Sequence, residues 1–362
     1  MGVTASQQAP KDNSNSEPTS GANLSLIRAA LGGGMLRRFA IGCFACLVMF
    51  AWVAVPVSAG CPPPRGRDLT FGVSPAVFIN YKITGSGNDV IVALHGFGGS
   101  LDTWNDIEPF LSDHRRIYAV DLPGFGLSAH PPGFSYTVRE QAESISAFVQ
   151  FVHDQNPGSR LTILGHSFGG SIALVAAVAL VDQNRPILDS LVLIDAPGFP
   201  QNVHLPIYLR FLTLPIINRL VLHLVPSTVL ARTALRRGIH RRDLISHERV
   251  CQYAQFINAP GGHDSLIKTI RQLRAPEVAA LSARIAEIQT PSLILWGTHD
   301  MLLSPNQAEL LHGALRESRP VVYLDAGHLL HEEQPEATTK LMEEFLESLK
   351  QPSALSLGIP HK

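Results

Sequence analysis

The chain has 362 residues, of which 45% are hydrophobic and 16% are charged, and its formal net charge is −1. This length is enough for one large hydrophobic core, or for a core with a smaller inserted domain. A charge so close to zero gives no electrostatic reason to expect a nucleic acid as a partner. The composition therefore indicates a globular protein that does not bind nucleic acid.

The first 34 residues differ in composition from the rest of the chain. Residues 1–34 are rich in Ser, Asn, Gln and Pro and lack a periodic apolar pattern. Such a segment does not bury enough apolar surface to fold, so we expect a disordered lead. If translation starts at Met35 instead, this lead is not part of the protein.

Residues 35–60 have the layout of a targeting segment. Arg37 and Arg38 precede an uncharged apolar run over 39–57, and small residues follow it. This order is typical of a signal peptide, with cleavage after Ala59. The run is also about as long as a membrane span, so an uncleaved membrane anchor is the alternative. Both interpretations place the remaining chain outside the cytoplasm, in the cell envelope or secreted.

Cys61 opens a short linker over residues 61–67. The letters "VSAGC" before and including it resemble a bacterial lipoprotein signal, which suggests lipidation of Cys61, although Ser58 stands where that signal prefers Leu. Without a lipid, Cys61 can form a disulfide with Cys251 in an oxidising compartment. The two hypotheses exclude each other, because lipidation would leave Cys251 as a lone thiol.

From residue 68 onward, short apolar segments alternate with amphipathic ones. Near-continuous apolar strands separated by helical patterns predict a mostly parallel sheet with helices on both faces, an α/β fold. We expect its core to comprise 68–198 and 289–350, with a helical lid inserted over 199–288 and a tail over 351–362. The expected strands are an antiparallel edge strand at 75–83 and further strands at 89–96, 116–124, 161–167, 190–198, 291–300 and 320–328.

Polar residues follow these expected strands at the end where functional groups gather in parallel sheets. They are His95, Asp121, Ser167, Asp195, Asp300 and His328. Of these, we expect His95 to support the loop that follows it and Asp121 to brace a turn. The remaining positions are candidates for chemistry.

Ser167 lies in "GHSFGG", between small residues, where a strand is expected to pass into a helix. Small neighbours permit a strained turn that exposes the hydroxyl at the helix N-terminus. A serine hydroxyl needs a histidine base, and the base needs a carboxylate to orient it. Asp300 and His328 follow in the chain order Ser, acid, His. Asp195 is the alternative acid.

On these motifs the chain resembles the α/β-hydrolase fold superfamily, over 68–350. The matching segments are "HGFGGS", "DLPGFGLS", "GHSFGG", "WGTHD" and "AGH". The resemblance is to its serine esterase and lipase branch, including monoacylglycerol-lipase-type hydrolases. It implies a catalytic triad of Ser167, Asp300 and His328, and an oxyanion hole formed by the backbone N–H groups of Phe97 and Phe168.

Neither a cofactor nor a metal ion is expected. "HGFGGS" lacks the lysine and the spacing of a phosphate-binding loop. No Cys-x-x-Cys pair with a second ligand pair occurs, which argues against a structural zinc site. Charged residues and histidines near the triad are expected to be solvated rather than to bind metal; they are His299, Asp325, His331, Glu332 and Glu333.

The expected lid suggests the kind of substrate. Residues 205–230 are strongly apolar, and residues 199–250 hold eight arginines, no lysine and two acidic residues. An apolar face with a basic rim suits an anionic membrane surface. We therefore expect a small-molecule ester as substrate, lipid-like or of medium chain length. The alternatives are a carbon–carbon bond hydrolase of the same fold and a non-catalytic exported binding module.

Overall fold

The computed structural model of the protein describes a single folded body, to which all statements below refer. Its residues are 61–62, 68–200, 217–257, 259–272 and 282–350. The expected lead (1–34), targeting segment (35–60) and tail (351–362) lie outside the described residues, as do 63–67 of the linker and 201–216, 258 and 273–281 of the expected lid. No helix among the described residues is long and apolar enough to cross a membrane.

The body is built on an eight-stranded sheet in the order β1-β2-β4-β3-β5-β6-β7-β8. β1 and β2 are antiparallel to each other, β2 is antiparallel to β4, and all the other neighbours are parallel. The strands are β1 (Leu69–Ser74), β2 (Val77–Thr84), β3 (Asp89–Leu94), β4 (Arg115–Val120), β5 (Leu161–His166), β6 (Ser190–Ile194), β7 (Ser292–Gly297) and β8 (Val322–Leu324). The expected α/β fold with a mostly parallel sheet is confirmed.

One strand prediction was wrong in its position. The segment expected to be the edge strand is β2, which pairs with β1 on one side and with β4 on the other. The edge strand on this side of the sheet is β1, whose alternate residues are exposed. Such a half-exposed strand lacks the continuous apolar run by which the other strands were recognised, and it was not predicted.

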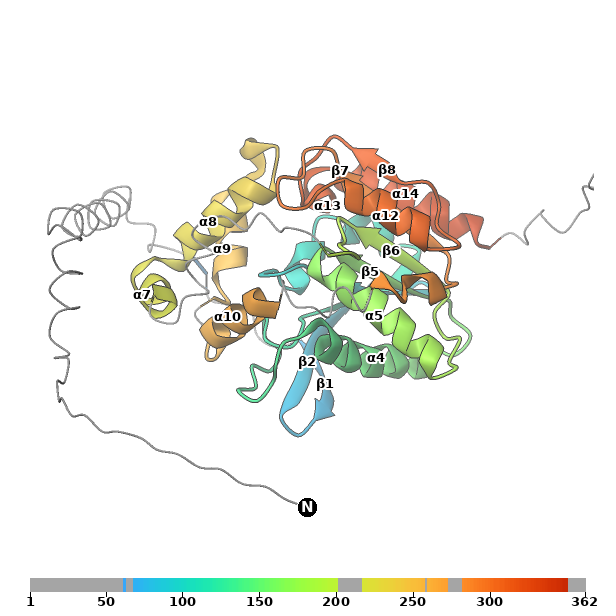
Figure 1. The fold of residues 1–362 in the computed structure, drawn as a ribbon, viewed down its shortest axis with the longest axis horizontal. Helices are drawn as coiled ribbons and strands as arrows, with labels where there is room; N and C mark the ends of the chain where they lie inside the picture. Colours follow the sequence, from blue (N-terminus) through green and yellow to red (C-terminus); the bar gives the residue numbers. More distant parts are fainter. Residues whose placement is uncertain (1–60, 63–67, 201–216, 258, 273–281, 351–362) are drawn as a thin grey trace, which may run out of the picture. The chain divides into compact units, whose positions relative to one another are not determined.

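Helices cover both faces of the sheet, because each strand alternates its side chains between the two faces. In β3, Val90 and Val92 pack on one face of the sheet, whereas Ile91 and Ala93 pack on the other. Figure 1 shows these layers. The first face carries α4 (Val138–Gln155), α5 (Phe168–Asp182), η3 (Ile285–Glu287) and α12 (Asn306–Ala314), and the second carries η1 (Leu101–Trp104), α3 (Glu108–Leu111), α13 (Leu330–Glu333) and α14 (Pro335–Ser348).

The insertion between β6 and β7 contains helices and no strand among its described residues, and we call its part ahead of η3 the lid. Its elements are α7 (Ile217–Leu224), α8 (Ser227–Gly238), η2 (Arg242–Leu244), α9 (His247–Ala254) and α10 (Gly262–Gln272). Figure 1 shows the four α-helices grouped on one side of the sheet. Leu235 of α8 and Val250 of α9 share a small apolar core with Leu329, the residue after His328. The lid helices therefore pack directly on the segment that carries the candidate base.

Cys61 is bonded to Cys251 of α9 in a disulfide. Lipidation at Cys61 requires a free thiol, so the lipoprotein hypothesis is incompatible with this structure. The pairing hypothesis holds instead. The disulfide attaches the first described residues of the chain to the lid.

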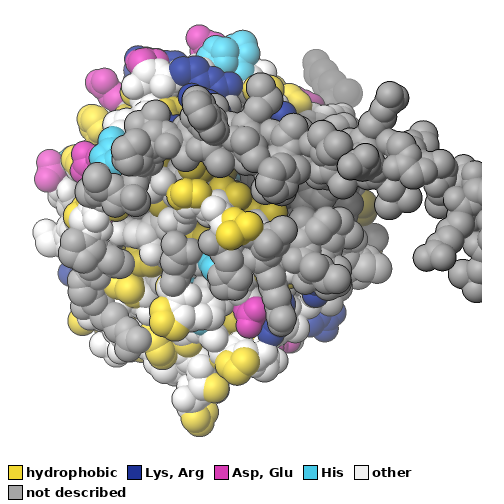
Figure 2. Space-filling view, turned by 90° about the vertical axis from the view of Figure 1, so that its left-hand side faces the viewer, with side chains coloured by type: hydrophobic (Ala, Val, Ile, Leu, Met, Phe, Trp, Pro, Cys, Tyr) yellow, Lys and Arg dark blue, Asp and Glu magenta, His cyan; other side chains and the backbone are white. Residues whose placement is uncertain are grey.

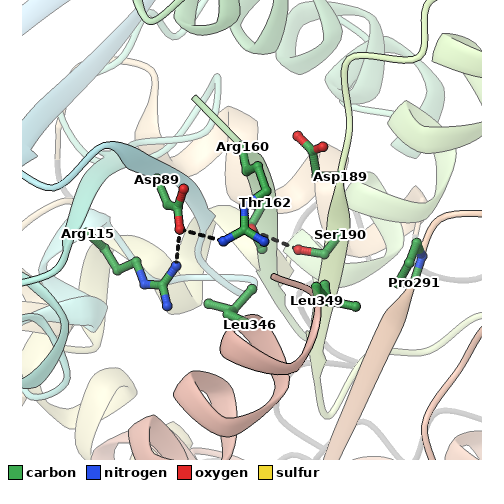
Figure 3. A pocket seen from close by; sticks show the side chains of 9 residues that line it. All are labelled: Asp89, Arg115, Arg160, Thr162, Asp189, Ser190, Pro291, Leu346 and Leu349. Carbon is green, nitrogen blue, oxygen red and sulfur yellow. Dashed lines mark hydrogen bonds and ion pairs between the residues drawn. The ribbon is translucent and has the colours of Figure 1, made fainter. Parts of the chain in front are cut away.

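A polar pocket lies at the amino ends of the central strands (Figure 3). Arg115, at the start of β4, is 1% exposed and forms ion pairs with Asp89, Glu343 and Glu347, each at 2.6 Å. Arg160 shares Asp89 with it, at 2.9 Å. Burial alone would raise the pKa of Asp89, but hydrogen bonds from Arg160 and Lys350 outweigh burial and lower that pKa. The carboxylates and guanidinium groups satisfy one another here.

Candidate active site

Ser167 occupies a strained turn between β5 and α5. Its φ of +50° lies in a region that residues with a Cβ rarely adopt. Two glycines make the turn sterically feasible. A Cβ on Gly169 would lie 2.4 Å from the carbonyl oxygen of Leu94, and one on Gly165 would lie 2.7 Å from Gly170 Cα. The flanking glycines therefore let the turn pack tightly against β3, as expected from the sequence.

The structure brings Ser167, His328 and Asp300 together at the carboxyl end of the sheet. His328 Nε2 lies 2.8 Å from Ser167 Oγ, and His328 Nδ1 lies 2.8 Å from Asp300 Oδ2. The Asp300 side chain is fully buried and that of His328 is 7% exposed. Because the carboxylate accepts from Nδ1–H, Nε2 is left as an acceptor for the serine hydroxyl proton.

Asp300 is held in place by its own backbone surroundings. Its second oxygen, Oδ1, accepts hydrogen bonds from the N–H groups of Leu302 at 2.7 Å and Leu303 at 3.0 Å. The carboxylate therefore has partners on both oxygens, which fixes the orientation in which it meets the histidine.

Asp195, the alternative acid, lies beside this arrangement. Its Oδ1 accepts from Gly297 N–H at 2.8 Å, and its Oδ2 is buried without a hydrogen-bond partner among the described residues. Burial and the neighbouring Asp300 raise the pKa of Asp195 well above its ordinary value. A carboxyl group that resists ionisation is poorly suited to stabilise an imidazolium, and the structure pairs His328 with Asp300.

Two further histidines line the inner side of His328. The Nε2–H of His166 donates to the backbone carbonyl of His328 at 2.9 Å, which holds the loop that carries the base. The His331 ring lies 4.6 Å from the His166 ring and 4.9 Å from Trp104. Burial lowers the pKa of His166 and takes that of His331 to about 3. Both side chains therefore stay neutral, so that no positive charge lies beside His328 on this side.

The loop after β3 carries Phe97. His95 anchors it, because Nδ1–H donates to the Gly96 carbonyl at 2.7 Å and Nε2 accepts from Leu122 N–H at 3.1 Å. Asp121 accepts from Leu101 N–H at 2.7 Å and so fixes the far end of the loop. These are the supporting roles that the sequence indicated for His95 and Asp121.

Phe168 is the first residue of α5 and follows the candidate nucleophile directly. The N–H groups of Phe97 and Phe168 donate no hydrogen bond to another residue in the described part of the chain. The first N–H groups of a helix lack partners within it, so that of Phe168 is available to an anion.

Three residues expected to be solvated are buried instead. His331, Glu332 and Glu333 are 0%, 4% and 4% exposed, so that expectation was wrong. They belong to α13, which packs into the sheet through Leu330. The apolar pair Leu329–Leu330 directly before them was the available signal, because it buries the turn on which they lie.

Glu333 joins the lid to the loop of the candidate base. Its carboxylate accepts from the N–H groups of Gly327 at 2.7 Å, His240 at 3.0 Å and Arg241 at 2.8 Å. On the other side of His328, Leu329 N–H donates to the carbonyl of Gly238 at 3.2 Å. Both neighbours of His328 are thus tied to the end of α8, a connection that the sequence did not reveal.

Glu332 fixes α9 to the core. It accepts from Arg249 and from the hydroxyl of Tyr253, and Arg249 also donates to Asp106 at 2.8 Å. Burial raises the pKa of Glu332 to about 7, against the lowering effect of Arg249. The lid is therefore attached to the core through a buried polar network as well as through apolar packing.

An eight-stranded, mostly parallel sheet with a serine on a strained strand–helix turn, a histidine and an aspartate at its carboxyl end defines a class of hydrolases. A family model described as the alpha/beta hydrolase fold matches residues 89–335. The chain belongs to this family.

Individual relatives within the family have different activities. A monoacylglycerol lipase of Xenopus laevis is 26% identical, over 78% of this chain and 85% of its own. A 2-hydroxy-6-oxo-2,4-heptadienoate hydrolase of Pseudomonas putida is 27% identical, over 74% of this chain and 92% of its own. The solved structure of a thermophilic esterase from Thermogutta terrifontis, 22% identical, superposes with a TM-score of 0.63 over 79% of this chain and 99% of its own, which shows the shared fold. The chain is thus similar to hydrolases of more than one substrate class.

Proposed function

We propose that the protein is a serine hydrolase that cleaves carboxylic esters through an acyl-enzyme on Ser167. The observation that supports this most directly is the pair of 2.8 Å hydrogen bonds that link Ser167 to His328 and His328 to Asp300. This is the geometry in which a histidine takes the proton of a serine while a carboxylate stabilises the resulting imidazolium.

In the proposed reaction, Ser167 Oγ attacks the ester carbonyl carbon while His328 Nε2 takes the hydroxyl proton. The tetrahedral intermediate collapses, the bond to the alcohol breaks, and His328 returns the proton to the leaving oxygen. Water then attacks the acyl-enzyme with His328 again as the base. The carboxylic acid leaves and Ser167 is regenerated.

The oxyanion of the tetrahedral intermediate needs donors that are already in place. The N–H groups of Phe97 and Phe168 fit this role, since neither donates to another described residue and the loop of Phe97 is anchored through His95 and Asp121. Pre-oriented donors of this kind stabilise negative charge in the transition state more than in the substrate.

The proposed substrates are lipid-like or medium-chain esters, met at a membrane surface. The arginine-rich, apolar composition of residues 199–250 supports this, as does the similarity to a monoacylglycerol lipase. Figure 2 looks onto the lid side, where described hydrophobic side chains are visible near the centre and both basic and acidic side chains lie toward the margin. An apolar segment with an excess of arginine over acidic residues suits anionic lipid headgroups.

Export of the protein is part of the proposal. The disulfide between Cys61 and Cys251 supports it, because such bonds persist in oxidising compartments and are rare in the cytosol. The apolar run at 39–57 supplies the targeting signal or the anchor.

Hydrolysis of p-nitrophenyl esters of graded chain length by the full chain in mild detergent tests the proposal. We expect turnover, best with medium chains, and covalent labelling by a fluorophosphonate probe. Ser167→Ala should lose labelling and about 10⁴-fold or more of kcat while its circular dichroism spectrum stays unchanged. Labelling of this variant at the wild-type level would overturn the assignment of the nucleophile.

A carbon–carbon bond hydrolase remains the second candidate, supported by the 27% identical Pseudomonas putida hydrolase. The two candidates differ in substrate, so the same preparation should be offered a ring-cleavage product of the 2-hydroxy-6-oxo-dienoate type. Turnover of that compound with none of the esters would select the second candidate.

A further inference from the structure

Three side chains gather on the surface beside the candidate active site, and the proposed reaction does not use them. They are His240, which follows α8 in the lid, His299, which precedes Asp300, and Asp325, which follows β8. One ligand atom from each lies within 4.8 Å of those of the other two, and all three residues are exposed. Folding brings them together from separate segments.

Their backbones are held by bonds to the core. Glu333 accepts from His240 N–H at 3.0 Å, and His299 N–H donates to the carbonyl of Ala326 at 2.9 Å. The side-chain amide of Gln334 donates to the carbonyl of Asp325 at 2.6 Å. The three Cα positions are therefore fixed, and only side-chain rotations separate different arrangements of the ligand atoms.

The side chains already contact one another. His299 Nε2 lies 2.8 Å from Asp325 Oδ1, and the rings of His240 and His299 stack with centroids 3.9 Å apart and planes at 9°. Two bonds of about 2.1 Å to a metal ion join atoms up to about 4.2 Å apart, so the spacing is close to that of a coordination site. Because the two stacked rings are parallel, the lone pairs of their nitrogens do not converge on one point. One ring must rotate before a nitrogen of each histidine can face the same ion.

We propose that His240, His299 and Asp325 bind one divalent transition-metal ion of the Zn²⁺, Ni²⁺ or Cu²⁺ class. Two imidazoles and one carboxylate favour these ions over Mg²⁺ and Ca²⁺, which prefer oxygen ligands. The side chains of His299 and Asp325 are 45% and 83% exposed, which leaves room for ring rotation and for water at the remaining coordination positions. The proposal departs from the expectation of no metal site, which considered His299 and Asp325 without the distant His240.

A metal ion bound at this site would link the lid to the loops of the candidate triad. His240 belongs to the lid, whereas His299 and Asp325 lie on the two loops that carry Asp300 and His328. A bound ion is a bridge between the lid and these loops. The ion adds to the hydrogen bonds by which Glu333 already joins these segments, and it stabilises the attachment of the lid to the core.

Two other groups of potential ligands must be separated from this one. Cys61, Cys251 and His247 lie together, but both sulfurs are bonded in the disulfide and offer no thiolate. His166, Asp195 and His328 also lie together, at the buried candidate active site. Variants of the surface site leave both groups intact.

Titration calorimetry of the untagged full chain in mild detergent with ZnCl₂ and with NiCl₂ tests the proposal. We expect one ion per chain at this site. His299→Ala and Asp325→Asn, both at exposed positions, should each weaken its binding at least tenfold. MgCl₂ should give no binding at the same concentrations.

His153→Ala is the matched control. His153 is also an exposed histidine next to a carboxylate, with Nδ1 3.4 Å from Asp154, but it belongs to no cluster of three potential ligands among the described residues. Its substitution should leave metal affinity unchanged. ZnCl₂ should also raise the thermal midpoint of wild type and of His153→Ala, by about 2 to 4 °C at saturating concentrations, and not that of His299→Ala. Equal affinities for wild type, His299→Ala and Asp325→Asn would overturn the proposal.

Discussion

The two ends of the same sheet differ in how their buried polar groups are paired. At the amino ends of the strands, the buried Arg115 forms ion pairs with three carboxylates, of which that of Asp89 is seen in Figure 3. At the carboxyl ends, Ser167 has a positive φ and Asp195 keeps a buried oxygen without a partner among the described residues. Strain and unmet polar groups cost stability, so their presence beside the candidate triad marks a place where chemistry takes precedence over stability.

The largest effect should be on kcat, and it should come from substitution of Asp300, the acid at the carboxyl end of the sheet. Asp300→Asn should lower kcat for a p-nitrophenyl ester by about 10³- to 10⁴-fold, because the amide no longer stabilises the imidazolium or its tautomer. Asp195→Asn should lower it less than about tenfold, because that carboxyl group resists ionisation already. A greater loss in Asp195→Asn than in Asp300→Asn would reverse the assignment of the acid.

At the amino end, Arg115→Met should destabilise the fold without affecting chemistry. It leaves three carboxylates without their buried partner, which should cost about 3 kcal/mol in the free energy of unfolding measured with urea. The kcat of the folded enzyme should stay unchanged. Arg160→Met is the matched control, since Arg160 shares Asp89 but is 31% exposed, and its loss should be about 1 kcal/mol or less. A loss of kcat in Arg115→Met would show that the two ends are coupled.

The buried histidines should make the carboxyl end sensitive to acid. The pKa of His331 is about 3 in the folded protein, against an ordinary value of 6.5. Between these values the unfolded chain takes up a proton that the folded protein does not, so stability falls as pH falls below 6.5. The contribution is about 1.4 kcal/mol per pH unit. His331→Phe should reduce the acid slope of unfolding free energy by this amount, measured from pH 6.5 to 4.5.

The acid slope of His331→Phe needs a comparison with another histidine variant. His153→Phe makes the same substitution at an exposed histidine and is the variant for comparison. Asp121 and Glu332 oppose the effect, since burial raises their pKa values to about 6 and about 7, but they are common to all the variants. Identical slopes in wild type and His331→Phe would mean that His331 is protonated in the folded protein.

The smallest effect should come from a neutral hydrogen bond at the amino end. The hydroxyls of Thr162 and Ser190 lie 2.8 Å apart and are buried. Thr162→Val leaves the Ser190 hydroxyl without its partner and should cost about 1 kcal/mol, with kcat unchanged. Adding Ser190→Ala should recover most of the loss, because both partners are then apolar. A double variant less stable than the single one would show that packing rather than hydrogen bonding dominates here.

The fold and the three residues at the centre of the site could be predicted from the sequence for physical reasons. Buried parallel strands are apolar along their whole length, and a parallel sheet brings the residues after its strands to one common edge. Ser167 and Asp300 come after such strands, and His328 comes after β8, a short parallel strand at the edge of the sheet. Their meeting therefore required only the correct sheet order. The exposed alternation of β1 gave no comparable signal.

Other parts of the site depend on contacts that no local pattern encodes. Glu333 looks like a surface residue in the sequence, and its burial results from the docking of α13 and from the backbone of the lid. The choice between lipidation and pairing at Cys61 depended on the distance to Cys251, which is set by the packing of α9. The approach of His240 to His299 is of the same kind. Each joins segments far apart along the chain.

The bond from Cys61 to α9 closes a covalent ring around most of the fold, since its two cysteines are 190 positions apart. Every peptide bond from the linker through the first half of the lid lies inside that ring. A protease that cuts the lid ahead of α9 therefore releases no fragment under non-reducing conditions, and the two pieces separate only after reduction.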